Sequence, residues 1–251
     1  GGGGNRGGRL DRGKARDRSA RRRGGLEVMY KPRVKGHNAP LLDKSEYDAA
    51  KPEFSSSWKL WHSVFFLVGG WSFVFGTWVL LFYPDWDGRL YYSALWYTIG
   101  SAGFLCLDTQ ESITYTQESK WVRLNIMCSW WGSVLYLVGS VGFFPSVYGW
   151  SDQIGIQGFI QGSFIIGLSE LWKVHRIGSD GEGFSMNRLF GSWDKWTATF
   201  VEMGPCTGAW CFFIGTFMYW HSPVGDNYLH VLYFWLVGSF MFSLGGVICT
   251  W

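Results

Sequence analysis

The chain has 251 residues, a formal net charge of +3 and an aromatic content of 20% that includes 17 tryptophans. Its mean hydropathy of +0.03 averages a very polar first quarter with an apolar remainder, and this distribution indicates a membrane protein. The five cysteines form no CxxC motif and fall in or at the ends of apolar stretches, so they support neither a disulfide framework nor a zinc site.

Residues 1–57 form a basic segment rich in glycine and arginine. Its first 52 residues hold 14 of the 22 lysines and arginines, including Arg21, Arg22 and Arg23. A segment so poor in apolar residues cannot form its own core, so we expect an extramembrane tail. The three arginines are expected to contact lipid headgroups or an acidic partner protein, and not nucleic acid. Because the first residue is Gly1 and not methionine, we also expect a processed or truncated form.

Six apolar stretches follow the tail. A hydrocarbon core of ~30 Å requires about 17 to 25 helical residues, which these stretches supply. A soluble protein with a large buried helical core is the alternative to a membrane protein. Many tryptophans and tyrosines lie near the ends of the stretches, where amphipathic rings favour the headgroup layer. The predicted spans are 58–83, 91–107, 124–145, 153–172, 198–220 and 229–251.

A repeated glycine pattern organises these spans. Residues 69–77 read GGWSFVFGT, residues 132–140 read GSVLYLVGS and residues 208–216 read GAWCFFIGT. A second glycine followed by serine comes 23 or 24 residues after the last glycine of each of these segments. Glycines seven residues apart share one helix face and allow another helix to approach closely. The predicted packing glycines are Gly69, Gly76, Gly100, Gly132, Gly139, Gly162, Gly208, Gly215 and Gly238.

This internal triplication predicts an all-α integral membrane protein of six helices arranged as three hairpins. The hairpin repeats are residues 58–108, 121–176 and 196–251. Short turns with proline and aspartate join the two spans of each hairpin, and longer polar segments join one hairpin to the next. Of the lysines and arginines, only Arg89 lies on the side of the short turns. The positive-inside rule therefore places both termini on the stromal or matrix side.

The second hairpin resembles a known family. Residues 135–178, LYLVGSVGFFPSVYGWSDQIGIQGFIQGSFIIGLSELWKVHRIG, are similar to the bacterial YrhK-like domain, with two spans that bear glycine–hydroxyl pairs and a basic patch after the second span. The resemblance implies a membrane hairpin and no particular activity. This chain departs from the family pattern because it has three copies and a long basic tail.

Few residues in the spans have the chemistry of a catalytic site. Asp108, Glu170 and Lys173 fall at predicted span ends, as ordinary interfacial residues do, and Glu202 is the best inward-facing acid. His62 and His230 lie about one turn into their spans and are candidate pigment ligands, because imidazole can bind the magnesium of a chlorophyll. No catalytic triad, zinc-protease motif or phosphate-binding motif is present, so we expect no enzyme activity.

These features together predict a non-catalytic accessory subunit of a large energy-converting membrane complex. Its partners would be other subunits and membrane lipids, with chlorophyll or carotenoid at its periphery. The aromatic excess favours an algal photosystem in the thylakoid membrane. A respiratory complex or ATP synthase of the mitochondrial inner membrane is the second interpretation, and a small transporter or channel of three parallel hairpins is the third.

Overall fold

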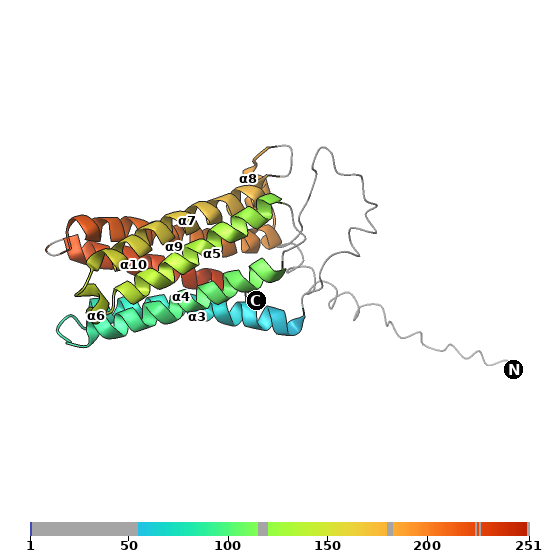
Figure 1. Ribbon diagram of the computed structural model, residues 1–251. Helices are drawn as coiled ribbons and strands as arrows, with labels where there is room; N and C mark the ends of the chain where they lie inside the picture. The colour runs from blue at the N-terminus through green and yellow to red at the C-terminus, as the bar shows by residue number, and fades with distance from the viewer. Residues whose placement is uncertain (2–54, 115–119, 180–182, 224, 226, 250–251) are drawn as a thin grey trace.

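The computed structural model describes Gly1 and residues 55–114, 120–179, 183–223, 225 and 227–249. Within these residues the chain is helical throughout, apart from one isolated bridge between Ser179 and Phe184. The long helices lie side by side along one axis (Figure 1). They are α3 (Ser56–Phe82), α4 (Arg89–Thr114), α5 (Lys120–Gly142), α7 (Asp152–Gly178), α9 (Trp193–His221) and α10 (Asn227–Cys249).

Local sequence signals set several helix ends. The hydroxyl of Ser55 accepts a hydrogen bond from the Trp58 amide and so caps α3. Pro145 begins α6 (Pro145–Tyr148), a single turn between α5 and α7. Gly225, in the turn before α10, has a φ of 106°, which glycine adopts without strain. A second short helix, α8 (Met186–Phe190), precedes α9.

The apolar character of these helices fits a membrane protein. By length and composition, four helices of the described chain qualify as membrane spans: Ser56–Phe82, Lys120–Gly142, Asp152–Gly178 and Asn227–Ile248. Helices α4 and α9 are as long as these but are not among the four. The prediction of a helical membrane protein is thus confirmed. The structure identifies four helices that qualify as spans, and the prediction that all six helices cross the membrane stays a prediction.

The helices form a closed ring. The two helices of each predicted hairpin pack together, as α3 with α4, α5 with α7 and α9 with α10. Further contacts join α4 to α5 and α7 to α9, and α10 packs against α3. The last helix of the chain therefore lies beside the first long one.

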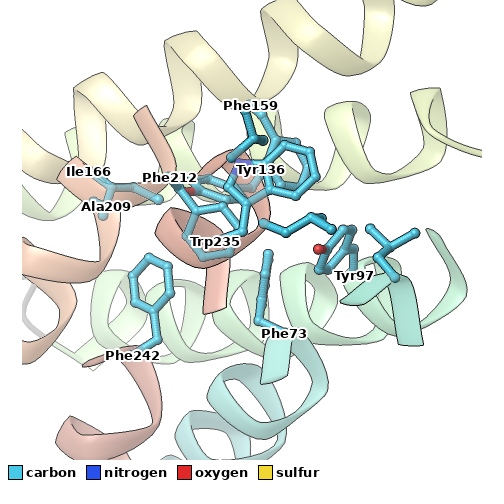
Figure 2. Close-up of a cluster of buried hydrophobic side chains, with 12 residues drawn as sticks. Phe73, Tyr97, Tyr136, Phe159, Ile166, Ala209, Phe212, Trp235 and Phe242 are labelled. Carbon is cyan, nitrogen blue, oxygen red and sulfur yellow. The ribbon is translucent and has the colours of Figure 1, made fainter. Parts of the chain in front are cut away.

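Aromatic side chains fill the centre of this ring (Figure 2). Phe73, Tyr136 and Phe212 occupy the same place in the three glycine segments, and their ring centroids lie 5.3 to 6.2 Å apart. Each of the three is at most 2% exposed. With their neighbours they form what we call the aromatic core: Phe73, Tyr97, Tyr136, Phe159, Phe212, Trp235 and Phe242.

The nine predicted packing glycines lie where the helices of a hairpin cross. A Cβ atom on any of them would come within 3.0 Å of an atom of the partner helix, for example 2.6 Å from Phe73 Cδ2 at Gly100 and 2.8 Å from the Gly238 carbonyl oxygen at Gly208. Real Cβ atoms do not tolerate such distances. A side chain at these positions would therefore push the two helices apart.

Candidate functional site

The structure brings six ionisable side chains together at the end of the ring where α3 begins. The sequence interpretation placed Asp108, Glu170 and Lys173 at the membrane interface, whereas the structure turns them inward. Asp108 is 7% exposed and Glu170 is 5% exposed. We call the group the charged cluster: His62 of α3, Asp108 and Glu111 of α4, Glu170 and Lys173 of α7, and Glu202 of α9.

Helical spacing positions these side chains. Asp108 and Glu111 are three residues apart on α4, and Glu170 and Lys173 are three residues apart on α7, so each pair shares one helix face. Helix α4 also continues to Thr114, beyond the predicted end of the first hairpin at Asp108, and this extension carries Glu111 inward.

Lys173 is the electrostatic centre of the charged cluster. Its Nζ lies 2.9 Å from Glu170 Oε1, 3.7 Å from Glu202 Oε2 and 4.0 Å from Glu111 Oε2. The Lys173 side chain is only 12% exposed, so these carboxylates take the place of its hydration shell. One ammonium thus joins acidic groups from three helices.

Two side chains complete the charged cluster through other contacts. The Nε2 atom of His62 lies 3.9 Å from Glu111 Oε1, and its ring stacks on Trp58 with centroids 4.6 Å apart. The Trp58 indole in turn donates a hydrogen bond to Thr114. Asp108 accepts a hydrogen bond from the Ser133 hydroxyl of α5. The charged cluster is therefore tied to four helices of its own and to α5.

Two atoms of the charged cluster are buried without a hydrogen-bond partner among the described residues. They are Nδ1 of His62 and Oε2 of Glu170. Both residues are more than nine-tenths buried and line a cavity of about 50 Å³. Ligand pockets for drug-sized molecules measure about 300 to 1,000 Å³, so this cavity fits water-sized species.

The cavity is polar at one end and apolar at the other. The charged cluster lines its outer part, next to Ser129 and Ser133. Its inner part is bounded by side chains that include Tyr136 and Phe242 of the aromatic core. The aromatic core thus closes the cavity toward the middle of the bundle.

The two histidines predicted as pigment ligands lie in different surroundings. His62 is inside the bundle and faces Glu111, where an electrostatic role fits its contacts better than binding of a large planar ring. His230 is exposed near the start of α10, at the opposite end of the bundle. Pigment binding at either histidine stays a prediction. Arg21, Arg22 and Arg23 lie outside the described residues.

Sequence reasoning identified Glu202 but missed the cluster as a whole. Alignment of the repeats would have helped to find it. Asp108 comes eight residues after Gly100, and Glu170 comes eight residues after Gly162, the equivalent glycine of the second hairpin. Equivalent positions on a shared face predict that both acids point inward. No three His, Cys, Asp or Glu side chains in the described part of the chain are placed to hold a metal ion.

Comparison with known proteins finds no matching family model, no matching curated protein and no matching solved structure. The resemblance of residues 135–178 to the YrhK-like domain therefore stays a prediction.

Proposed function

We propose that this protein is a six-span membrane protein of three related hairpins that acts as a non-catalytic accessory subunit of a larger membrane assembly. The observation that carries the proposal is the aromatic core. Side chains from all three hairpins fill the axis of the ring, where a transporter or channel would need a polar pathway. The central space is used for packing, which suits a structural role.

The packing of the ring supports the proposal that α4 and α9 cross the membrane together with the four helices that qualify as spans by composition. Each of them has at least 26 residues, enough to cross a bilayer that needs about 17 to 25. Each also packs between two helices that qualify as spans by composition. A helix held in that position has the same membrane depth as its neighbours.

Equivalent contacts support the triplication. Ser101 follows the second glycine of the first hairpin and hydrogen-bonds with Ser140 of the second hairpin at 2.8 Å. Ser239 follows the second glycine of the third hairpin and lies 3.3 Å from Thr77 of the first. In both cases the hydroxyl after a second glycine meets the hydroxyl that ends the glycine segment of the next hairpin around the ring.

The outer surface supports association with lipids and neighbouring subunits. Large aromatic side chains that are at least 40% exposed lie on α3, α5, α7, α9 and α10. Rings at this depth suit lipid tails, carotenoids and chlorophylls as well as protein partners. This surface is our reason for placing an algal photosystem first and a mitochondrial complex second. The residues include Trp71, Phe75, Trp78, Trp131, Phe164, Phe217 and Phe240.

Charge supports the proposed orientation. All lysines and arginines of the described residues except Arg89 lie at the end of the bundle that holds the charged cluster: Lys59, Lys120, Arg123, Lys173, Arg176, Arg188 and Lys195. The positive-inside rule assigns that end to the stroma or matrix. The basic tail enters α3 from the same side and is proposed to contact acidic partner surfaces or lipid headgroups there.

Purification from native membranes tests the proposal. In mild detergent the protein should migrate with an assembly much larger than its own 28.6 kDa, together with other subunits. Removal of residues 1–35 should weaken the association at low salt, and the difference from the parent should shrink at high salt, because the electrostatic contacts of the tail are screened there. A stable monomer or small homo-oligomer from native membranes would contradict the accessory-subunit proposal.

A small transporter is the second candidate, and the one-sided cavity with its charged cluster is the observation that favours it. The two functions differ in a direct measurement. Purified protein in liposomes should give no solute flux above that of empty vesicles if the aromatic core stays closed. Flux that requires the cluster residues would favour the transporter instead.

A further inference from the structure

The charged cluster contains more negative than positive charge. Four carboxyl groups face one lysine, and His62 adds a positive charge only when it is protonated. If all four carboxyl groups were ionised, at least two negative charges would be left without an internal partner. Burial makes such an excess costly, and buried groups commonly remove it by binding protons.

The described residues that line the cavity do not supply the missing positive charge. Helix α5 contributes the hydroxyls of Ser129 and Ser133 to the cavity, and α10 contributes Phe242. The nearest further cation on α7 is Arg176, which is exposed one turn beyond the end of the cluster. Among the described residues that line the cavity, Lys173 and His62 are the only basic side chains.

Glu170 has the geometry of a proton carrier. Its Oε1 accepts from Lys173 at 2.9 Å, while its Oε2 is buried without a partner in the described residues. Glu202 approaches the same ammonium at 3.7 Å, so the two carboxyl groups lie side by side. A proton on Glu170 Oε2 removes their mutual repulsion and gives the unpartnered oxygen a hydrogen to donate.

The cavity gives this proton a route to one side of the membrane only. The Glu202 side chain is 19% exposed, so the charged cluster opens to the outside of the bundle at that end. The volume of about 50 Å³ accommodates water, which can carry a proton to Glu170. In the other direction, Tyr136 and Phe242 close the cavity.

We propose that the charged cluster is an exchangeable proton-binding site, in which Glu170 takes up a proton from water on the side of the tail while Lys173 stays positively charged. The ionised carboxylate of Glu170 becomes a carboxylic acid, and hydronium becomes water. The aromatic core keeps the proton from crossing, so the site senses the pH of one compartment. This site is independent of the accessory role proposed above.

Infrared spectroscopy of the full-length protein in detergent tests the site, because the carbonyl stretch of a protonated carboxyl group is separate from the bands of a carboxylate. We expect a protonated-carboxyl band at neutral pH that shifts in D₂O and disappears at alkaline pH. Glu170→Gln should remove the largest part of this band, and any remainder belongs to another buried carboxyl group of the charged cluster, such as Asp108. Asp85→Asn, which changes an exposed acid in the distant turn, should leave it unchanged.

Two further variants test the assignment and guard against a folding defect in Glu170→Gln. Glu202→Gln removes a neighbouring negative charge, so the band should titrate at lower pH. Lys173→Met removes the positive charge, so the band should persist to higher pH. Loss of the band in Asp108→Asn, with retention in Glu170→Gln, would overturn the assignment. Absence of any protonated-carboxyl band, or a band that responds to sodium or potassium at constant pH, would overturn the proton site.

Discussion

Phe73 is the residue on which the packing of the bundle centres. It is fully buried in the middle of the glycine segment of α3, and its side chain points into the centre of the ring of helices (Figure 2). Its centroid lies 5.3 to 6.2 Å from six other aromatic rings, in stacked, tilted and edge-on arrangements: Tyr97, Phe104, Tyr136, Phe159, Phe212 and Phe242. No single helix pair holds the centre, because these rings come from all three hairpins.

Truncation of Phe73 should therefore destabilise the whole bundle. Phe73→Ala leaves a cavity at the axis, and such changes cost about 3 to 5 kcal/mol. Unfolding of the purified protein in mixed micelles, followed by denaturant titration, measures the effect. Phe240→Ala is the matched control, since Phe240 is 45% exposed on α10. Equal losses in the two variants would show that the aromatic core does not dominate stability.

Gly139 should be the least tolerant of the three glycines that end the repeated segments. A Cβ there would lie 2.8 Å from the Phe159 nitrogen and 3.0 Å from the Gly158 carbonyl carbon, and backbone atoms cannot rotate away. At Gly76 and Gly215 the closest atoms belong to the side chains of Tyr97 and Trp235, and the nearest backbone atom at Gly76, the Ser93 carbonyl oxygen, is 3.2 Å away. The ring gives every hairpin two neighbours, so the backbone contact, and not a central place in the chain, singles out Gly139.

Leucine substitutions measure this order. We expect Gly139→Leu to cost at least the ~1 to 3 kcal/mol typical of overpacking and to cost more than Gly76→Leu or Gly215→Leu. Thermal melting in mild detergent reports the ranking. Val138→Leu serves as a control, because Val138 is 48% exposed on the same turn of α5. Three leucine variants that melt like the parent would refute close packing at the repeated glycines.

At the scale of helices, close glycine contacts and buried hydroxyl pairs hold the ring together, both within hairpins and between them. Inside a hairpin, glycine faces glycine, as where a Cβ on Gly162 would lie 3.0 Å from the Gly132 carbonyl oxygen. Between hairpins, buried hydroxyls pair, as Ser101 does with Ser140. The glycine contacts set the distance between two helices through van der Waals packing. The hydroxyl pairs fix how two helices are aligned along their length, through a hydrogen bond.

The Ser101–Ser140 pair should show measurable coupling. Both hydroxyls are fully buried, and Ser140 also donates to the Tyr136 carbonyl, which leaves its oxygen to accept from Ser101. A double-mutant cycle with Ser101→Ala and Ser140→Ala should give a coupling of about 0.5 to 1.5 kcal/mol. Unfolding in micelles gives the four free energies. Strict additivity would mean that the two hydroxyls do not stabilise the contact between α4 and α5.

The sequence predicted the individual helices well and the end of α4 poorly. Proline, serine caps and glycine mark the turns locally, so the structure places most predicted ends within a few residues. Helix α4 runs seven residues beyond the predicted limit at Leu107, because Asp108 and Glu111 looked like the start of a polar connection. Their partners lie on a different hairpin, Lys173 beside Glu111 and Ser133 beside Asp108, and local sequence contains no sign of these contacts.

At the scale of the molecule, the arrangement of the hairpins could not be predicted from local sequence either. The repeated glycines predict which helices pair, but not that α10 returns to α3. The charged cluster depends on this arrangement, since its side chains come from α3, α4, α7 and α9. Their positions at the ends of apolar spans made Asp108, Glu170 and Lys173 look like three separate interfacial residues, and only closure of the ring brings the members of the cluster together.

Because the ring of helices is closed, the order of the hairpins along the chain can be changed without changing their order around the ring. Helix α10 runs alongside α3 in the opposite direction and ends at Cys249, at the same end of the bundle as the start of α3 (Figure 1). A circular permutant that joins these ends with a short flexible linker and begins at Lys120, ending at Thr114, keeps every hairpin intact. It should fold to the parent helix content and melt near the parent temperature, as circular dichroism would show.

A second permutant, opened in the turn between α3 and α4, separates two helices that must enter the membrane as a pair, and it should assemble poorly. Equal behaviour of the two permutants would contradict the hairpin as the unit of assembly. If the expected difference holds, any of the three hairpins can be made first. The structure then fixes only the order in which the hairpins follow one another around the ring.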